Sequence, residues 1–276
     1  MTFGINTDAV FAFAGILLMV MGIIRFFIIK NAANNRTEII KSDDLIMKYL
    51  KQDCILYAQM IEAYSSDYCK LIYGENDGVL LYDERMDYYL ASAKTKNGAF
   101  DIIRKVKSCA ALICFDEVLY EEVEKKLHYN SIFEAYNVLY QKDSGFNINS
   151  SAEVKMLDNS YLNIIKQNYP IKQYANDEYL LGVINRGMIG VFVNNELAGF
   201  IGTHANNALG LLHVLEKYRN QHLGTLLLAS YINYLKNKKY KGPLYGYIEK
   251  NNTASLNLCF KLGFTRSKHT VKWYMS

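Results

Sequence analysis

Residues 209–224, which read LGLLHVLEKYRNQHLG, decide how the C-terminal half of the chain is interpreted. Residues 209–215 are an apolar run of strand length, and a polar, basic segment follows at residues 218–223. Beyond it, glycine and apolar residues recur at the spacing of one helix face: Gly224, Leu227, Leu228, Tyr231, Ile232 and Leu235. The pattern predicts a strand that leads through a turn into the N-terminus of a helix.

The predicted turn has the chemistry of a phosphate-binding site. A helix N-terminus presents unpaired backbone N–H groups and the positive end of the helix dipole. Arg219 adds a cation within the turn. No Gly-Lys-Ser/Thr follows, so the segment is not a P-loop. One glycine in a turn also leaves open an ordinary corner whose Arg219 and His222 are solvated.

Composition indicates a folded protein without a nucleic-acid signature. The chain has 276 residues, enough for two domains, with 51% hydrophobic and 21% charged residues. Its 31 Lys and Arg against 27 Asp and Glu give a net charge of +4, which is too mild to favour nucleic acid as a partner. The 5 cysteines are odd in number and form no C-x-x-C pair, which predicts reduced thiols and no metal site.

The N-terminus departs from this composition. Residues 9–24 carry no charge, and the apolar character resumes after Arg25 through residue 29. A helix over residues 9–29 would reach roughly the 30 Å of a bilayer core. It is apolar on all sides, and it lacks both the preceding basic residues and the A-x-A site of a signal peptide. We therefore favour a membrane anchor, with a buried core helix or upstream sequence outside the functional protein as the alternatives.

The nearby basic residues all follow the uncharged run at residues 9–24: Arg25, Lys30, Arg36 and Lys41. The positive-inside rule then places Met1 outside and the bulk of the chain in the cytoplasm. Residues 1–36 are accordingly predicted to form an anchor and linker that attach a cytoplasmic protein to the cell membrane.

Two further segments follow, separated by a polar linker. Residues 37–141 predict a compact α/β domain, and residues 142–151 (KDSGFNINSS) have the composition of a linker. The elements expected in the first segment are a helix at 43–64, strands at 69–73, 79–82 and 88–93, a helix at 99–107, a strand at 110–115, a helix at 117–127 and a strand at 132–140. The elements expected after the linker are helices at 159–168 and 177–186, strands at 188–193, 197–204 and 209–215, a helix from 224, a strand at 243–249, a helix after Asn252 and a last strand at 264–275.

Two motifs in the last segment carry a resemblance. Residues 219–224 read RNQHLG, residues 252–264 read NTASLNLCFKLGF, and Gly199 and Gly202 occur in the preceding strand. These segments resemble the Arg/Gln-x-x-Gly-x-Gly/Ala loop and the late Asn-x-x-x-x-x-Leu-Tyr-x-Lys-x-Gly-Phe signature of the GNAT superfamily of acyl-CoA-dependent N-acyltransferases. Both motifs stand in the family's order, and the resemblance covers residues 152–276.

The resemblance implies an α/β fold, in which a mixed, mostly antiparallel twisted sheet is flanked by helices and splays between the strands at 209–215 and 243–249. Acetyl-CoA would enter this gap as co-substrate, with its pantetheine arm on the backbone and its pyrophosphate on the N–H groups of the turn. The cofactor-binding residues that the resemblance implies are Val214, Leu215, Arg219, Asn220, Gln221, His222, Leu223, Gly224, Thr225 and Asn252. The sequence departs from the family at His222, which replaces the loop's first glycine, and at Cys259, which replaces a tyrosine that often serves as general acid.

The implied reaction is direct attack of a primary amine on the thioester, which needs a base, an oxyanion site and an acid for the leaving thiolate. His213 has the unperturbed pKa of a base, with a structural sheet histidine as the alternative. Glu216 is a candidate for orienting a water or binding the amine, with a solvated carboxylate as the alternative. Cys259 stands in the position of the missing acid, or is a buried, inert thiol. His204 is expected to be structural.

The first segment has the element order of a GNAT half that lacks the loop. This order suggests a tandem arrangement, with a degenerate GNAT-like domain at 37–141, the linker at 142–151, and a GNAT N-acetyltransferase domain at 152–276. The first domain would then build one wall of the acceptor pocket or a homodimer surface.

The sequence therefore predicts an acetyl-CoA-dependent N-acetyltransferase that acts on a small-molecule or peptide amine. The alternative is a non-catalytic acyl-CoA-binding sensor or interaction protein, which the two departures from the family motifs support.

Overall fold

The chain divides into residues 1–48 and a second unit, residues 49–276, which is compact. The structure is a computed structural model that describes residues 45–171 and 175–276. The predicted anchor at residues 9–29 lies outside these ranges, and none of the described helices combines the length and the apolar character that a bilayer span requires. Both sheets and the candidate site belong to the second unit.

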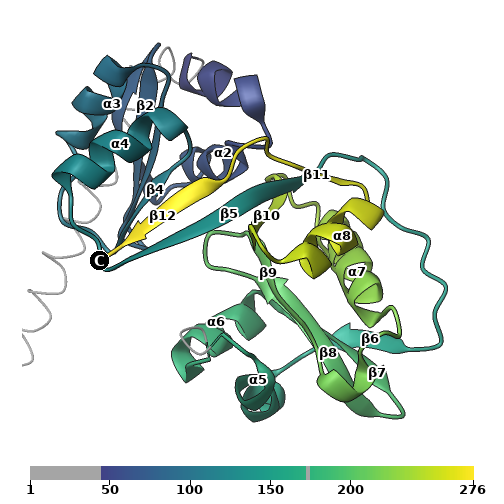
Figure 1. Ribbon diagram of the computed structural model, residues 1–276. Coiled ribbons are helices and arrows are strands. Elements are labelled where there is room, and N and C mark those ends of the chain that lie inside the picture. The colour runs from purple at the N-terminus through teal and green to yellow at the C-terminus, as the bar shows by residue number, and fades with distance from the viewer. Residues whose placement is uncertain (1–44, 172–174) are drawn as a thin grey trace, which may run out of the picture. The chain divides into compact units, whose positions relative to one another are not determined.

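Two sheets organise the second unit (Figure 1). The larger has eight strands in the order β1-β2-β3-β4-β12-β5-β10, with β11 paired to β5. These strands are β1 (Cys69–Glu75), β2 (Gly78–Asp83), β3 (Tyr88–Ala93), β4 (Ala111–Cys114), β5 (Ser131–Tyr140), β10 (Leu244–Glu249), β11 (Phe264–Arg266) and β12 (Val271–Met275). The smaller sheet has four strands in the order β6 (Glu153–Met156), β7 (Ile189–Val193), β8 (Glu196–Thr203) and β9 (Leu209–Val214).

Among the described pairs, only β3 and β4 run parallel, and the others are antiparallel. The predicted class, a mixed and mostly antiparallel α/β fold, is confirmed. Sequence patterns do not indicate β6, because it is a short edge strand whose residues are mostly exposed and carry no alternation.

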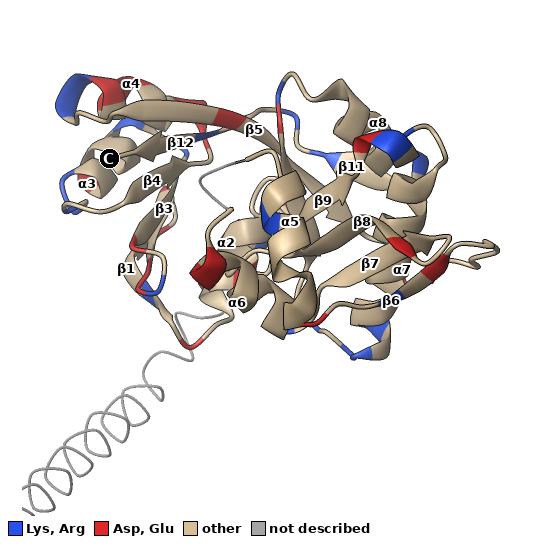
Figure 2. Cartoon of the chain, turned by 90° about the horizontal axis from the view of Figure 1, so that it is seen from below, with Lys and Arg blue, Asp and Glu red and all other residues tan. Residues whose placement is uncertain are grey.

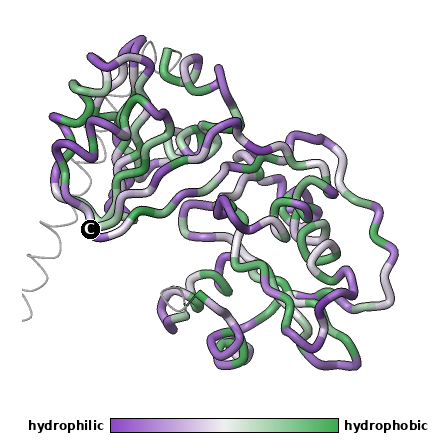
Figure 3. The backbone as a smooth tube through the Cα atoms, viewed as in Figure 1, coloured by the Kyte–Doolittle hydropathy of each residue, from purple (hydrophilic) through white to green (hydrophobic). Residues whose placement is uncertain are grey.

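Helices cover both faces of the smaller sheet. The helices of the unit are η1 (Lys51–Asp53), α2 (Ala58–Tyr64), α3 (Lys96–Ile103), α4 (Glu117–Lys126), η2 (Asn159–Tyr161), α5 (Leu162–Asn168), α6 (Asp177–Gly187), η4 (Glu216–Tyr218), α7 (Leu223–Asn237) and α8 (Thr253–Lys261). Phe200 of β8 belongs to a core cluster with Leu180 of α6, whereas its neighbour Ile201 belongs to a cluster with Leu227 of α7. Because both faces are covered, β8 is buried along its length after Glu196, and Figure 3 shows the hydrophobic colour along these strands.

The larger sheet is covered by α3 and α4 over β2, β3 and β4, where their apolar residues share one core cluster. The outer side of α4 carries basic and acidic residues side by side (Figure 2). Lys126 and Glu122 form an i,i+4 pair at 2.8 Å there. The predicted continuous helix at 43–64 is wrong, because the Asp53 side chain accepts from the Leu56 N–H at 2.9 Å and starts a new turn.

The predicted last strand at 264–275 is also wrong in its continuity, because it is split into β11 and β12. At the break, the Ser267 hydroxyl donates to the His269 carbonyl at 2.6 Å and accepts from the Asn137 N–H at 3.2 Å. A side chain that makes hydrogen bonds to the local backbone in this way competes with the backbone hydrogen bonds between strands. Beyond the break, β12 pairs with β5 on one side and β4 on the other.

The C-terminal strand therefore completes the sheet of the first half. Strands β10 and β11 also pair with β5, so the segments before and after the predicted linker at 142–151 share one sheet. The division into domains at 37–141 and 152–276 stays a prediction.

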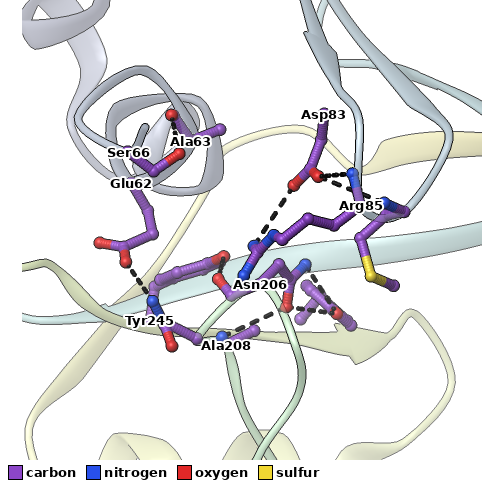
Figure 4. A network of polar contacts seen from close by, with 11 residues as sticks. Glu62, Ala63, Ser66, Asp83, Arg85, Asn206, Ala208 and Tyr245 are labelled. Atoms are coloured by element: carbon purple, nitrogen blue, oxygen red, sulfur yellow. Dashed lines mark hydrogen bonds and ion pairs between the residues drawn. The ribbon is translucent and has the colours of Figure 1, made fainter. Parts of the chain in front are cut away.

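A polar network lies where α2 of the first half meets the turn between β8 and β9 (Figure 4). The buried Glu62 carboxylate accepts from Asn207 Nδ2 at 2.6 Å. The Tyr245 hydroxyl of β10 donates to the Asn206 carbonyl at 2.7 Å. Because buried polar groups cost free energy when left unpaired, these bonds hold the turn in one conformation.

Candidate functional site

A cleft of about 540 Å³ opens between β9 and β10. The two strands pack side by side but belong to different sheets. Residues of β5, β9, β10, β12, α7 and α8 line the cleft, whose size lies within the range of small-molecule sites, about 300–1,000 Å³. The resemblance implied a sheet that splays between these strands, and the structure confirms this separation.

Strand β9 presents an open backbone edge to the gap. The Leu215 N–H donates to the Ala198 carbonyl of β8 at 2.9 Å, and the Leu215 carbonyl accepts from the Tyr218 N–H at 2.9 Å. Successive residues of a strand direct their N–H and C=O groups to opposite sides, so those of Val214 point away from β8. The Arg219 Nε donates to the Val214 carbonyl at 3.3 Å. Of the two residues expected to pair with the pantetheine arm, Val214 thus has its backbone toward the gap.

A β-bulge interrupts β9 beside the cleft. Gly202 pairs with Gly210 and Phe200 pairs with His213, so that Leu211 and Leu212 together oppose a single residue of β8. Leu211 has a φ of 51°, a left-handed conformation that is costly for a leucine. Both leucines line the cleft. Sequence analysis missed the bulge, because a leucine holds the strained position and only the neighbouring glycine marks it.

The segment that links β9 to α7 has an irregular backbone. After η4, Asn220 and His222 adopt left-handed conformations with φ of 62° and 58°. His222 is the N-cap residue of α7, and its side chain makes no capping hydrogen bond. Asparagine and histidine are among the few residues that tolerate positive φ, which explains how His222 replaces the glycine of the family loop. The first N–H groups of α7 therefore carry the positive end of the helix dipole without a side-chain cap.

The two sequence motifs meet beside this helix end. A Cβ added to Gly224 would lie 2.9 Å from Cδ1 of Leu258 in α8, so a side chain at Gly224 would push α7 and α8 apart. Asn252 is the N-cap of α8, where its Oδ1 accepts from the Ser255 N–H at 3.1 Å, and it lines the cleft. Gly263 ends α8 with a φ of 87°, as its place in the signature predicts.

The three expected catalytic residues occupy different surroundings. The His213 ring packs against Phe200 and Tyr169, with centroid distances of 5.6 Å and 6.4 Å, and is not among the residues that line the cleft. Burial, and then the charge of Arg219, lower the pKa of His213. Glu216 is exposed at the start of η4, also outside the described lining. Cys259 lines the cleft, and burial raises the pKa of its thiol to about 12.

His204, which was expected to be structural, lines the cleft. Its Nδ1 shares a hydrogen bond with the Tyr179 hydroxyl, and its ring stacks on Tyr247 at 5.5 Å and 27°. A Cβ on Gly210 would lie 2.1 Å from the His204 Nε2, so the glycine makes room for the imidazole. Burial, and then Arg186, lower the pKa of His204 to about 4, which keeps it neutral near pH 7. Only Gly210, on the next strand, could have marked this position in the sequence.

Comparisons with known proteins support the assignment of this fold. No curated protein sequence matches the chain. Among solved structures, a Drosophila protein is similar over 86% of this chain and 96% of its own, at 14% identity and a TM-score of 0.62. A GCN5-related N-acetyltransferase from Kribbella flavida is similar over 80% and 94% respectively, at 12% identity and a TM-score of 0.50. A tandem GNAT protein from the clavulanic acid biosynthesis pathway covers 84% and 94%, at 12% identity and a TM-score of 0.43.

The protein-family comparison covers part of the segments that build the cleft. Residues 155–264 match the family described as Acetyltransferase (GNAT) family, and this range includes β9, the loop, α7, β10 and α8. The predicted family and fold are therefore both confirmed. The C-terminal half of the chain contains a domain of the GNAT acetyltransferase family.

Proposed function

We propose that this protein transfers an acetyl group from acetyl-CoA to the primary amine of an acceptor by direct attack. The observation that carries the proposal is the cleft between β9 and β10, whose lining residue Leu258 lies against Gly224 in the first turn of α7, where the helix N-terminus has no side-chain cap. An uncapped helix N-terminus beside an apolar cleft suits a molecule with a phosphate at one end and a thioester at the other.

The residues at hand fit acetyl-CoA as co-substrate, which supplies an activated acyl thioester when bound. The backbone N–H groups from Gln221 to Thr225, together with Arg219, would hold the pyrophosphate, because they combine dipole and charge. The outward N–H and C=O of Val214 would pair with an amide of the pantetheine arm. The Asn252 side chain would contact the arm from the opposite wall of the cleft.

The acyl transfer forms a C–N bond and breaks a C–S bond. The bulge at Leu211 and Leu212 interrupts the β8 ladder, so its backbone N–H groups are the proposed oxyanion donors. His204 lines the cleft and has its ring oriented by Tyr179, so it would accept a hydrogen bond from the attacking amine. A pKa of about 4 makes its imidazole a weak base, so solvent is the better acceptor for the amine proton.

The leaving thiolate also needs a proton. A thiol whose pKa is about 12 donates poorly, so Cys259 is a weak acid for this step and solvent is the better source. His213 and Glu216 are not among the residues that line the cleft. We therefore assign them a supporting role, shaping the end of β9, rather than contact with the reacting atoms.

The first half of the chain is proposed to be a degenerate GNAT-like domain that builds one wall of the cleft. Ile132, Phe133 and Val138 of β5 line it, which supports the wall over a homodimer surface. The membrane anchor at residues 9–29 and the cytoplasmic location remain predictions from the sequence.

Calorimetric titration of acetyl-CoA and CoA into the full chain, combined with thiol release on a panel of amines, tests the function. Micromolar binding together with amine-dependent release of CoA is the expected result. Binding without release from any amine would favour the alternative, a non-catalytic acyl-CoA sensor. Absence of binding would refute both.

A further inference from the structure

One face of the larger sheet carries a set of aromatic rings where it borders the cleft. Trp273 of β12 lies directly opposite Phe133 of β5, and Tyr247 of β10 lies opposite Asn137, also on β5. Phe133 and Asn137 are an even number of residues apart on one strand, so all these side chains share a face of the sheet.

Trp273 is the centre of this set. Its ring lies 4.9 Å from that of Tyr247, 5.7 Å from that of Tyr88 and 6.4 Å from that of Phe133, measured between centroids. These four residues are called the aromatic wall below. Phe133, Tyr247 and Trp273 line the cleft directly, and Tyr88 supports Trp273 from β3.

The rim of the cleft is apolar as well. Ile171 lines it and is 45% exposed. Large exposed apolar side chains that continue an apolar cleft mark a surface that a ligand covers. The rim therefore extends the apolar character of the aromatic wall to the entrance.

Charge is sparse in the same region. Among the described residues that line the cleft, Glu249 is the single one with a formal charge, because His204 is neutral. Glu249 pairs with Ala135 on β5, so it shares the face of the aromatic wall. One carboxylate matches one ammonium. A polyamine would need several carboxylates, and an amino acid would need a cation for its own carboxylate.

We infer that the acceptor is a monoamine whose body is bulky and apolar, an aromatic ring or an alkyl chain. Its body packs on the aromatic wall and on Ile171 at the rim, and Glu249 attracts its ammonium group. The inference rests on the proposed acetyl transfer and adds the class of substrate to it.

The experiment compares acceptors at saturating acetyl-CoA with the full chain. Phenethylamine and octylamine are expected to exceed spermidine and glycine in kcat/KM by about tenfold or more, the size of discrimination that apolar pockets give. A preference for spermidine or glycine would overturn the inference while leaving the proposed function intact.

A matched pair of variants locates the effect. Ile171→Gln, at a residue 45% exposed on the rim, should lower kcat/KM for octylamine several-fold and that for glycine far less. Met156→Gln, at a residue 48% exposed on β6 and outside the described lining, should change neither. If Ile171→Gln instead altered the preference between acetyl-CoA and octanoyl-CoA with the amine preference unchanged, the wall would bind the acyl chain and the inference would be wrong.

A binding measurement tests the inferred class of acceptor without turnover. The chain has 1 tryptophan, so its emission reports on Trp273 in the aromatic wall. Phenethylamine and octylamine should shift this emission in a saturable way, and spermidine and glycine should not. If no amine released thiol, the acetyl-transfer proposal would fail, and an emission unresponsive to the apolar amines would overturn the inference separately.

Discussion

Two of the corners at which a described strand turns into a helix N-terminus differ in the groups that face the helix end. In the first half, β3 leads through Lys94 and Thr95 into α3. In the second, β9 leads through Arg219 and His222 into α7. Each corner joins a strand to a helix and carries a basic residue, Lys94 in the first and Arg219 in the second, so the comparison turns on what faces the helix end.

The corner at α3 is closed by the protein's own groups. The Thr95 Oγ1 accepts from the Gly98 N–H at 3.0 Å and donates to Asp77 Oδ2 at 3.3 Å. A Cβ on Gly98 would lie 2.8 Å from that Asp77 oxygen, so a carboxylate already lies against the positive end of the helix. Lys94 is bonded to Tyr57 and lies 3.4 Å from Asp116.

The corner at α7 is left open. Its N-cap side chain makes no capping bond, and both Arg219 and His222 are exposed. The neighbouring strands differ in the same sense, because β3 is paired to β4, whereas β9 and β10 separate around the cleft. No side chain caps the N-terminus of α7, and β9 and β10 are not paired to each other. Both features are consistent with the proposed ligand site.

The largest expected effect comes from removing the first half of the chain, which contains the corner at α3. A fragment of residues 150–276 would lose β4 and β5, the strands with which β10, β11 and β12 pair. Unpaired strands expose their backbone groups and apolar faces, so we expect no cooperative unfolding transition. Circular dichroism during heating, beside the full chain, provides the check. A fragment that melted cooperatively and bound acetyl-CoA would show that the second half folds alone.

The comparison of the two corners becomes sharper when their cations are removed in turn. Arg219→Ala should weaken the binding of acetyl-CoA by about tenfold, the loss of a charge-assisted contact to phosphate. Lys94→Ala should leave the affinity unchanged, because Lys94 is engaged with Tyr57 and Asp116.

Calorimetry on both variants measures the difference, with thermal unfolding as the control for folding. Equal losses of affinity in the two variants would mean that net charge, rather than the open corner, attracts the ligand.

Most elements of the fold could be predicted from sequence, because their patterns are local. The strand β3 has the predicted bounds, and α6 and β5 differ from theirs by single residues. What sequence patterns miss depends on partners that are distant along the chain. The bulge at Leu211 is set by the register with β8, and the break at Ser267 is set by Asn137 of another strand.

The candidate site also contains both kinds of feature, those set by local sequence and those set by distant partners. The segment proposed to bind the pyrophosphate is contiguous, so Arg219, His222 and Gly224 could be found from their spacing. The cleft is assembled from strands far apart in the chain, so the prediction of His213 over His204 had only strand position to rest on. Gly210 packs against His204 from the next strand, and that contact exists only in the folded chain.

A smaller effect is expected at the closed corner itself. Thr95→Ala removes the acceptor for the Gly98 N–H and should lower the free energy of unfolding by about 1 kcal/mol. Thr95→Ser, which keeps the hydroxyl, should restore most of it. Urea unfolding measures both, and acetyl-CoA affinity should stay at the value of the unaltered chain. A change in that affinity would contradict the assignment of α3 as a helix end without a ligand.

The smallest effect is expected at the open corner, from His222→Gly. Glycine adopts the φ of 58° without steric cost, but it also gains freedom in the unfolded chain, so unfolding should shift by less than about 1 kcal/mol. Lys239→Gly, at an exposed residue with a φ of 56° beyond the end of α7, is the control for this backbone effect. Acetyl-CoA should bind His222→Gly as tightly as before or a few-fold more tightly, because a phosphate can approach the backbone more closely. Weaker binding in calorimetry would mean that the imidazole itself contacts the phosphate, and the departure from the family glycine would then be a gain of a ligand group.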